Sequence, residues 1–193
     1  MRQEIKQINR VIIVKEVMNK MNKTWLISDT HFNHERIIEY CSRPFKNVND
    51  MNENIIKNWN SVVKNGHKVY HLGDFGFGSK EQIKDIVSQL NGDIYLIRGN
   101  HCNHPNQWYR DCGIHEVYDH PIIIHDFIVL SHEPQSFIVN DKGPYINFFG
   151  HVHDSPIFET YGKRHFCACI ERHDYKPVEI KYILNKIGEK EKE

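Results

Sequence analysis

Five short motifs rich in aspartate and histidine follow five separate apolar runs of this chain. Each apolar run is predicted to be a strand, and sites in open α/β sheets form at the carboxyl ends of strands. Any one of these motifs is common by chance, whereas an ordered series of five is not. The motifs are Asp29-Thr30-His31, Gly73-Asp74, Gly99-Asn100-His101, Ser131-His132 and Gly150-His151-Val152-His153. The chain must therefore fold so that five strand ends meet at one site.

The residue types in the motifs indicate a metal site. Side chains at positions i and i+2 of an extended segment point to the same side, so Asp29 with His31, and His151 with His153, can converge on one ion. The motif glycines are expected to let the backbone turn sharply. Mixed oxygen and imidazole donors favour manganese, iron, cobalt or zinc over calcium or a structural zinc site. Seven donors suit two ions that share a carboxylate, the arrangement used for phosphoester hydrolysis.

The order of the predicted elements indicates an α/β fold. Strands are predicted at 24–28, 68–72 and 94–97, with helices at 34–42, 50–64 and 79–90 between them, which favours an α/β layered domain. Capping-box patterns beginning at Asp50 and Ser79 mark the starts of the second and third helices. Further strands are predicted at 122–125, 127–132, 145–149 and 166–170, followed by a helix at 178–186.

The domain organisation predicted is a single unit at 24–188, preceded by an extension at 1–23 and followed by a charged tail at 189–193. Codons for Lys15-Glu16-Val17 can resemble a bacterial ribosome-binding sequence, so Met21 or Met18 is a candidate native start and the preceding residues a translated leader. The alternative is an N-terminal helix that packs on the domain or mediates oligomerisation.

Composition restricts the functional classes. Lys+Arg and Asp+Glu both number 25, so the net charge does not favour a nucleic-acid partner, although one stays possible. No apolar run approaches the roughly 20 residues that span a bilayer, so no membrane role is expected. Five scattered cysteines, without a secretory signal, favour reduced thiols and a cytoplasmic location. The oligomeric state stays open.

Together the motifs resemble those of calcineurin-like metallophosphoesterases. The family pattern D-x-H, G-D, G-N-H, H and G-H-x-H matches in order, and the resemblance extends from Trp25 to about Ile183. The runs at 28–34, 43–45 and 131–134 are similar to small bacterial and phage-type members. The resemblance implies a four-layer α/β sandwich, in which two mixed β-sheets pack together and helices flank them.

The resemblance also implies a role for each motif residue. Asp74 would bridge two divalent ions, with manganese favoured and iron, cobalt, nickel or zinc also open. His101 would face the substrate phosphate and stabilise the transition state or protonate the leaving oxygen. The first ion would be held by Asp29, His31 and His153, and the second by Asn100, His132 and His151.

Three further residues near the first motif are candidates for substrate contact. Asn33 and His34 lie in the first loop, although a role at a helix N-terminus is equally compatible with their position. Arg43 could bind a substrate anion or be an ordinary surface arginine. Phe77 and Cys102 stand where many family members have aspartate, which is expected to leave His101 less firmly oriented and its pKa less raised.

The function predicted is hydrolysis of phosphodiester or phosphomonoester bonds by a metal-activated water, without a serine or cysteine nucleophile. The partner expected is a small phosphoester or a nucleotide. One alternative is a nuclease acting on RNA or DNA. Another is a non-catalytic interaction module that keeps the fold, which should show eroded ligands, whereas all seven are present.

Overall fold

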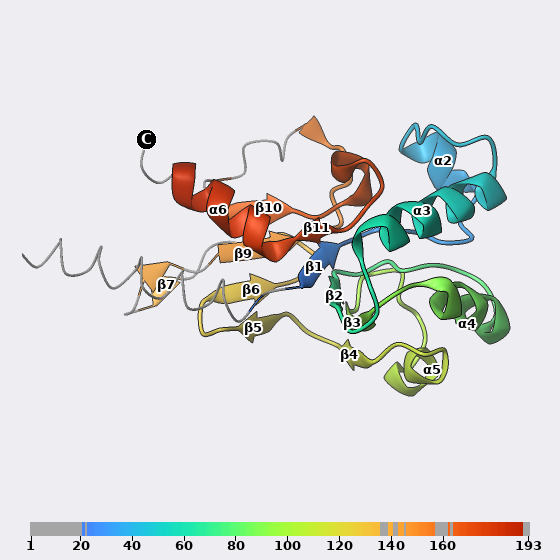
Figure 1. Cartoon of the computed structure of the whole chain (residues 1–193), viewed down its shortest axis with the longest axis horizontal. Coiled ribbons are helices and arrows are strands. Elements are labelled where there is room, and N and C mark those ends of the chain that lie inside the picture. The colour runs from blue at the N-terminus through green and yellow to red at the C-terminus, as the bar shows by residue number, and fades with distance from the viewer. Residues whose placement is uncertain are drawn as a thin grey trace, which may run out of the picture.

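A five-stranded mixed sheet forms one half of the computed structural model, which describes residues 21, 23–135, 139–140, 143–144, 146–156, 162 and 164–190 (Figure 1). Its strands run in the order β11-β1-β2-β3-β4. The four strands β1 to β4 are parallel, and β11 pairs antiparallel with β1. Their bounds are β1 Thr24–Ile27, β2 Lys68–His71, β3 Asp93–Ile97, β4 Glu116–Tyr118 and β11 Val178–Glu179.

A second, four-stranded mixed sheet has the order β10-β9-β6-β5. Strands β10, β9 and β6 are parallel, whereas β5 is antiparallel to β6. The bounds are β5 Ile122–Ile124, β6 Ile128–Leu130, β9 Ile146–Phe149 and β10 His165–Cys167, and a separate pair consists of β7 Val139–Asn140 and β8 Gly143–Pro144.

Helices flank these sheets (Figure 1). They are α2 Arg36–Tyr40, α3 Val48–Val62, α4 Lys80–Gln89, α5 Asn106–Asp111 and α6 Ile180–Lys190, with a 3-10 helix η2 at Ile170–His173. Helix α3 buries Met51, Ile55 and Trp59, which recur at the four-residue spacing of one helical face. These side chains contribute to a core against one face of the first sheet.

The strands of the first sheet separate two cores because successive side chains point to opposite faces. In β1, for example, Ile27 belongs to the core with α3, whereas Leu26 belongs to a second core. This second core also contains Leu130 of β6, Phe148 of β9 and residues of α6, so it joins the two sheets. The predicted α/β class with two mixed sheets and flanking helices is confirmed.

Several element boundaries differ from those predicted. Helix α3 begins at Val48, because the extended residue Asn47 caps it and accepts a hydrogen bond from the Asp50 N–H at 2.9 Å. The last helix, α6, begins two residues later than predicted, since Val178–Glu179 pairs with β1 before the chain enters the helix. The sequence pattern predicts neither α5 nor β4. The capping box at Ser79 and Gln82, by contrast, is present as expected.

The predicted N-terminal extension and tail are only partly within the described residues. Met21 is buried in the second core, and its carbonyl accepts a hydrogen bond from the Thr24 N–H. The proposed translated leader and the end of the charged tail lie outside the described residues, so both stay predictions. Within the described part of the chain, no helix combines the length and apolarity needed to cross a membrane.

The topology brings the predicted motifs to one end of the sheets. Parallel pairing aligns Ile27 of β1 with His71 of β2 and Leu96 of β3, so the loops that follow these strands emerge side by side. The residue after β1, Ser28, forms a parallel bridge with Cys169 beyond β10. This bridge joins the strand ends of the two sheets at the place where the motifs gather.

Candidate metal centre

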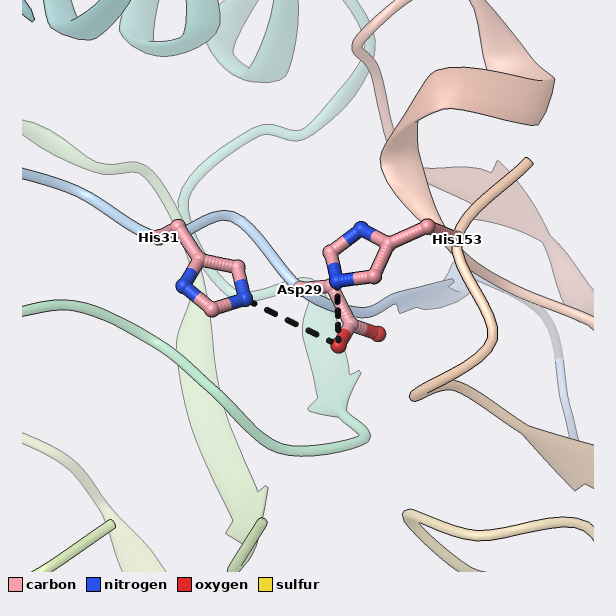
Figure 2. Close-up of side chains that lie close together, drawn as sticks. All are labelled: Asp29, His31 and His153. Carbon is pink, nitrogen blue, oxygen red and sulfur yellow. Dashed lines mark ion pairs between the residues drawn. The ribbon is translucent and has the colours of Figure 1, made fainter. Parts of the chain in front are cut away.

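The first group of facing side chains consists of Asp29, His31 and His153 (Figure 2). Asp29 Oδ1 lies 4.0 Å from Nε2 of His31 and 3.8 Å from Nε2 of His153. The Asp29 and His31 side chains are 0% and 2% exposed, and His153 is 20% exposed. Loops that follow β1 and β9 therefore place three potential metal ligands around one point.

Unpartnered atoms in this group fit a bound cation. Asp29 Oδ1 and His31 Nε2 are buried and have no hydrogen-bond partner within the described part of the chain. Asp29 Oδ2, in contrast, accepts hydrogen bonds from the His151 N–H at 2.8 Å and from Sγ of Cys169 at 3.3 Å. Buried polar atoms without partners are costly and rare, so a divalent ion between these atoms would satisfy both.

The ring of His31 has the charge state that a metal ligand needs. Burial, together with the positive charge of Arg43, holds the pKa of His31 far below its usual range, so the ring is neutral. Its Nδ1 lies 3.1 Å from Nδ1 of His34, which is close enough for one shared hydrogen. If that hydrogen resides on His31, Nε2 carries a lone pair directed at Asp29.

A second group consists of Asn100, His132 and His151. Asn100 Oδ1 lies 2.8 Å from Nε2 of His132 and 3.0 Å from Nδ1 of His151, and the two ring nitrogens are 3.2 Å apart. Nδ1 of His132 lies 2.8 Å from the carbonyl oxygen of Leu72, which can only accept, so this nitrogen carries the hydrogen. In the tautomer that carries its single hydrogen on Nδ1, Nε2 presents a lone pair to the Asn100 oxygen, a pairing that a cation would stabilise.

Asp74 lies between the two groups. Its Oδ2 is 3.8 Å from Nε2 of His31 and 3.5 Å from Nε2 of His132. Its Oδ1 accepts a hydrogen bond from the His101 N–H at 2.9 Å, which fixes the orientation of the carboxylate. Burial raises the pKa of Asp74 in the absence of a cation. The structure thus brings all seven predicted ligand side chains together, with one carboxylate facing both groups.

Left-handed backbone conformations are concentrated at these residues. Positive φ angles are uncommon outside glycine, and they cluster where a site dictates the backbone. The φ angles are 56° at Asp29, 49° at His31, 54° at Asp74, 70° at His151 and 46° at His153. This strained geometry at five of the seven side chains supports a functional role for the group.

Two motif glycines serve close packing rather than the sharp turns expected for them. A Cβ at Gly99 would collide with the Asp74 carboxylate, and one at Gly150 would collide with Ser28 and Asp29. Neither glycine has a positive φ, whereas Gly73 does, at 102°. Gly99 and Gly150 are therefore needed because the backbone passes directly against the carboxylates.

A carboxylate outside the motifs, Glu171, holds the far side of His153. Its Oε1 is 2.8 Å from Nδ1 of His153, opposite the nitrogen that faces Asp29. Burial disfavours charge on His153, but hydrogen bonds to Cys41 and Glu171 and the charge of Asp29 outweigh it and raise the pKa of His153 to about 11. No motif in the sequence marks Glu171, which lies in η2 and meets the site only through the tertiary fold.

The structure corrects the expectation that Arg43 contacts substrate. Its side chain is 0% exposed, and its guanidinium group donates to Glu171 and to the carbonyl oxygens of Asp29 and Thr30. Every one of these bonds lies behind the first group of ligands. A guanidinium buried and committed in this way cannot reach an incoming anion without breaking the loop it supports.

The other two candidates for substrate contact have different surroundings. The side-chain oxygen of Asn33 accepts a hydrogen bond from Asn52, the Asn33 backbone N–H donates one back, and the Asn33 amide donates to the carbonyl oxygen of Phe77, so Asn33 ties the first loop to α3. His34 is half-buried and packs its ring 4.5 Å from that of Phe77. Substrate contact by either side chain stays a prediction.

His101 is exposed beside the first group, and its ring centroid is 5.6 Å from that of His31. The ring of Phe77 is also 5.6 Å from His101, in the place where a carboxylate was expected. Cys102 is buried in the core, where burial raises the pKa of its thiol. Aromatic packing therefore supports His101 on the side that Phe77 occupies.

Comparisons with known proteins agree with this geometry. The chain matches the calcineurin-like phosphoesterase superfamily domain over residues 23–168. It is 36% identical to an uncharacterized protein of Methanocaldococcus jannaschii over 173 residues, which cover 86% of this chain and 92% of that protein. It is also 36% identical over 94 residues to the gene 66 protein of Mycobacterium phage L5, covering 47% of this chain and 44% of that protein.

A solved structure is similar as well. A protein of unknown function from Aquifex aeolicus superimposes with a TM-score of 0.65 at 28% sequence identity, covering 83% of this chain and 96% of that one. The family match includes the five motifs and both groups of facing side chains. The chain belongs to the calcineurin-like phosphoesterase superfamily.

Proposed function

We propose that this protein is a two-metal hydrolase of phosphodiester or phosphomonoester bonds. The observation that carries the proposal is the position of Asp74 Oδ2 between the nitrogens of His31 and His132. A carboxylate oxygen placed in this way can serve two cations at once. Two ions about 3.5–4 Å apart are the common apparatus for in-line displacement at phosphorus.

We propose manganese as the first choice for both ions, a metal that the mixed donor set admits. Carboxylate, carboxamide and imidazole donors suit manganese, iron, cobalt, nickel or zinc, and no thiol belongs to either of the two groups around Asp74. When bound, the two ions would neutralise charge on the phosphoryl oxygens and lower the pKa of the attacking water.

The side chains themselves would perform the remaining tasks. The His101 N–H holds Asp74 through Oδ1, which leaves Oδ2 directed at both ligand groups. The exposed His101 ring would donate a proton from an imidazole nitrogen to the leaving oxygen, the usual task of a general acid. Since neither Cys102 nor any other thiol is exposed beside His101, a cysteine nucleophile is not part of the proposal.

The substrate proposed is a small phosphoester or a nucleotide. The balanced charge of the chain gives no support for the alternative nuclease activity. We also propose a reducing cytoplasmic location, because the five cysteines, all described, are free thiols in the structure.

An assay of metal-loaded protein tests the function directly. Protein stripped of metal is loaded with Mn²⁺, Co²⁺, Ni²⁺ or Zn²⁺ and assayed with bis-p-nitrophenyl phosphate, p-nitrophenyl phosphate and a panel of nucleotides. Asp74→Ala should abolish hydrolysis, and His101→Ala should lower kcat while metal binding persists. The matched controls are Asp85→Ala and His120→Ala, both of which change exposed residues.

Two outcomes would contradict the proposal. Absence of hydrolysis with all four metals would favour a non-catalytic member of the family. Full activity in His101→Ala would remove the role of His101 as an acid while leaving the two-metal site in place.

A further inference from the structure

Glu171 is a buried charged residue that has no role in the proposed chemistry. Its side chain is 4% exposed, and it lies in η2, beyond the residues that match the family domain. Its Oε1 accepts hydrogen bonds from Arg43 Nη2 at 2.6 Å and from Arg43 Nε at 3.0 Å. The same oxygen lies 2.8 Å from Nδ1 of His153.

Arg43 also connects Glu171 to the loop that carries Asp29 and His31. Its Nη2 also donates to the carbonyl oxygen of Asp29 at 2.7 Å, and its Nη1 donates to the carbonyl oxygen of Thr30 at 2.9 Å. Thr30 separates the two ligands Asp29 and His31. One guanidinium thus binds the backbone of the first motif and the carboxylate that contacts His153.

The two nitrogens of His153 have opposite surroundings. Nδ1 faces Glu171, whereas Nε2 faces Oδ1 of Asp29 at 3.8 Å. A carboxylate that accepts from one ring nitrogen fixes the tautomer and the ring orientation, so that the other nitrogen is presented to a metal. Burial of both Arg43 and Glu171 makes a well-fixed pair, because guanidinium and carboxylate lose their hydration and depend on each other.

We propose that Glu171 is a positioning residue, which acts with Arg43 to hold His153 and Asp29 in the relative orientation that binds the first metal ion. The inference rests on the proposed two-metal function. The second group (Asn100, His132 and His151) has its own support in the Leu72 carbonyl and makes no contact with Glu171 among the hydrogen bonds described here. Loss of Glu171 should therefore affect one ion and spare the other.

Glu171→Gln keeps the shape of the side chain and removes its charge. We measure Mn²⁺ binding to the metal-free full-length protein by calorimetric titration. We expect the affinity of one site to fall about 10- to 100-fold, the usual cost of removing such a partner. The affinity of the other site should change less than about threefold. Glu116→Gln is the matched control, since it weakens an exposed Arg110–Glu116 pair that includes none of the candidate ligands and should change neither site.

A second measurement uses the wild-type protein and does not depend on how Glu171→Gln folds. In Zn²⁺-loaded protein, ¹⁵N-edited NMR should show a slowly exchanging Nδ1 proton on His153, assigned by its loss in His153→Gln. Absence of that proton, or unchanged affinity at both sites in folded Glu171→Gln, would overturn the positioning role. Equal weakening of both sites would overturn it too, because a general structural role predicts that result.

The outcomes also separate this inference from the proposed function. Wild-type protein that binds two Mn²⁺ ions and hydrolyses phosphoesters, combined with unchanged affinities in Glu171→Gln, would refute the inference alone. Wild-type protein that binds no Mn²⁺ would refute both.

Discussion

The carboxylate of Asp74 faces His31 and His132 with the same oxygen, at 3.8 Å and 3.5 Å from their Nε2 atoms. The two imidazoles come from loops that follow strands of different sheets. One oxygen atom of Asp74 therefore faces side chains that come from both halves of the fold. Its other oxygen already accepts a hydrogen bond from the His101 N–H, so rotation of the carboxylate would break a partly buried hydrogen bond.

Asp74→Asn should therefore weaken both ion sites together. An amide keeps the volume of the side chain but removes the negative charge that two cations would share. We expect Mn²⁺ affinity to fall more than about 100-fold at both sites, beyond the loss caused by removing an outer partner. Calorimetric titration beside wild-type protein measures this, and loss at a single site would show that Asp74 does not bridge.

Metal binding should release a proton from His153. In the metal-free protein, burial opposes the charge, but Cys41, Glu171 and Asp29 raise the pKa of His153 to about 11, so the ring is protonated at neutral pH. A metal must displace that proton, and affinity should therefore rise with pH across the neutral range. Calorimetry in buffers of different ionisation enthalpy should detect about one proton released per protein from this group, and no dependence on the buffer would contradict the assignment.

Much of the fold follows from sequence pattern, because the central elements are regular and buried. Strands β1, β2 and β3 are apolar runs that end in motifs, and the α4 capping box has a local signature. The short elements α5 and β4 escaped prediction, since a three-residue strand leaves no periodicity to detect. The pattern at Val178 predicts a helix, but pairing with β1 determines the conformation there.

The seven candidate ligand positions can also be predicted from the sequence, whereas the residues that support them cannot. Glu171 and Arg43 meet across the fold, and no short-range pattern connects residues separated by such a distance along the chain. The left-handed backbone at His151 and His153 is equally hidden, because neither residue type requires a positive φ. The sequence therefore indicates the candidate ligands but not the contacts that support them.

Gly99→Ala should damage the site through the backbone. The added Cβ would collide with the Asp74 carboxylate, so either the loop or Asp74 must shift. We expect the free energy of unfolding to fall by about 1–3 kcal/mol, as in other overpacked sites, and metal affinity to fall with it. Gly188→Ala in α6 is the matched control, because a Cβ there meets no atom within 4 Å. Urea denaturation of both variants separates the effects, and a neutral Gly99→Ala would contradict the close approach.

His71 should make the metal-free protein sensitive to acid. It is fully buried with Nε2 2.9 Å from Oγ1 of Thr30, and burial, followed by the charge of His132, lowers its pKa from 6.5 to about 3. The unfolded chain binds a proton below about pH 6.5 while the folded protein does not, so stability is lost as the pH falls from 6.5 toward 3.

The expected contribution of His71 to the slope is about 1.4 kcal/mol per pH unit. His71→Gln removes the titrating group while it can still bond to Thr30, so this part of the slope should disappear. Urea titrations of the metal-free protein between about pH 6.5 and pH 4 measure the difference. An identical slope in both proteins would show that His71 is protonated in the folded state.

Phe77 offers a test of how His101 is tuned. Its ring lies 5.6 Å from that of His101, so a carboxylate at this position would stabilise positive charge on the imidazole. As a general acid, His101 gives its proton to the leaving oxygen, so activity depends on the protonated ring. Phe77→Asp should therefore move the basic limb of the pH–kcat profile to higher pH, whereas Phe77→Leu, which adds no charge, should leave the limb in place. A basic limb that stays fixed in folded, metal-loaded Phe77→Asp would mean that another group supplies the proton.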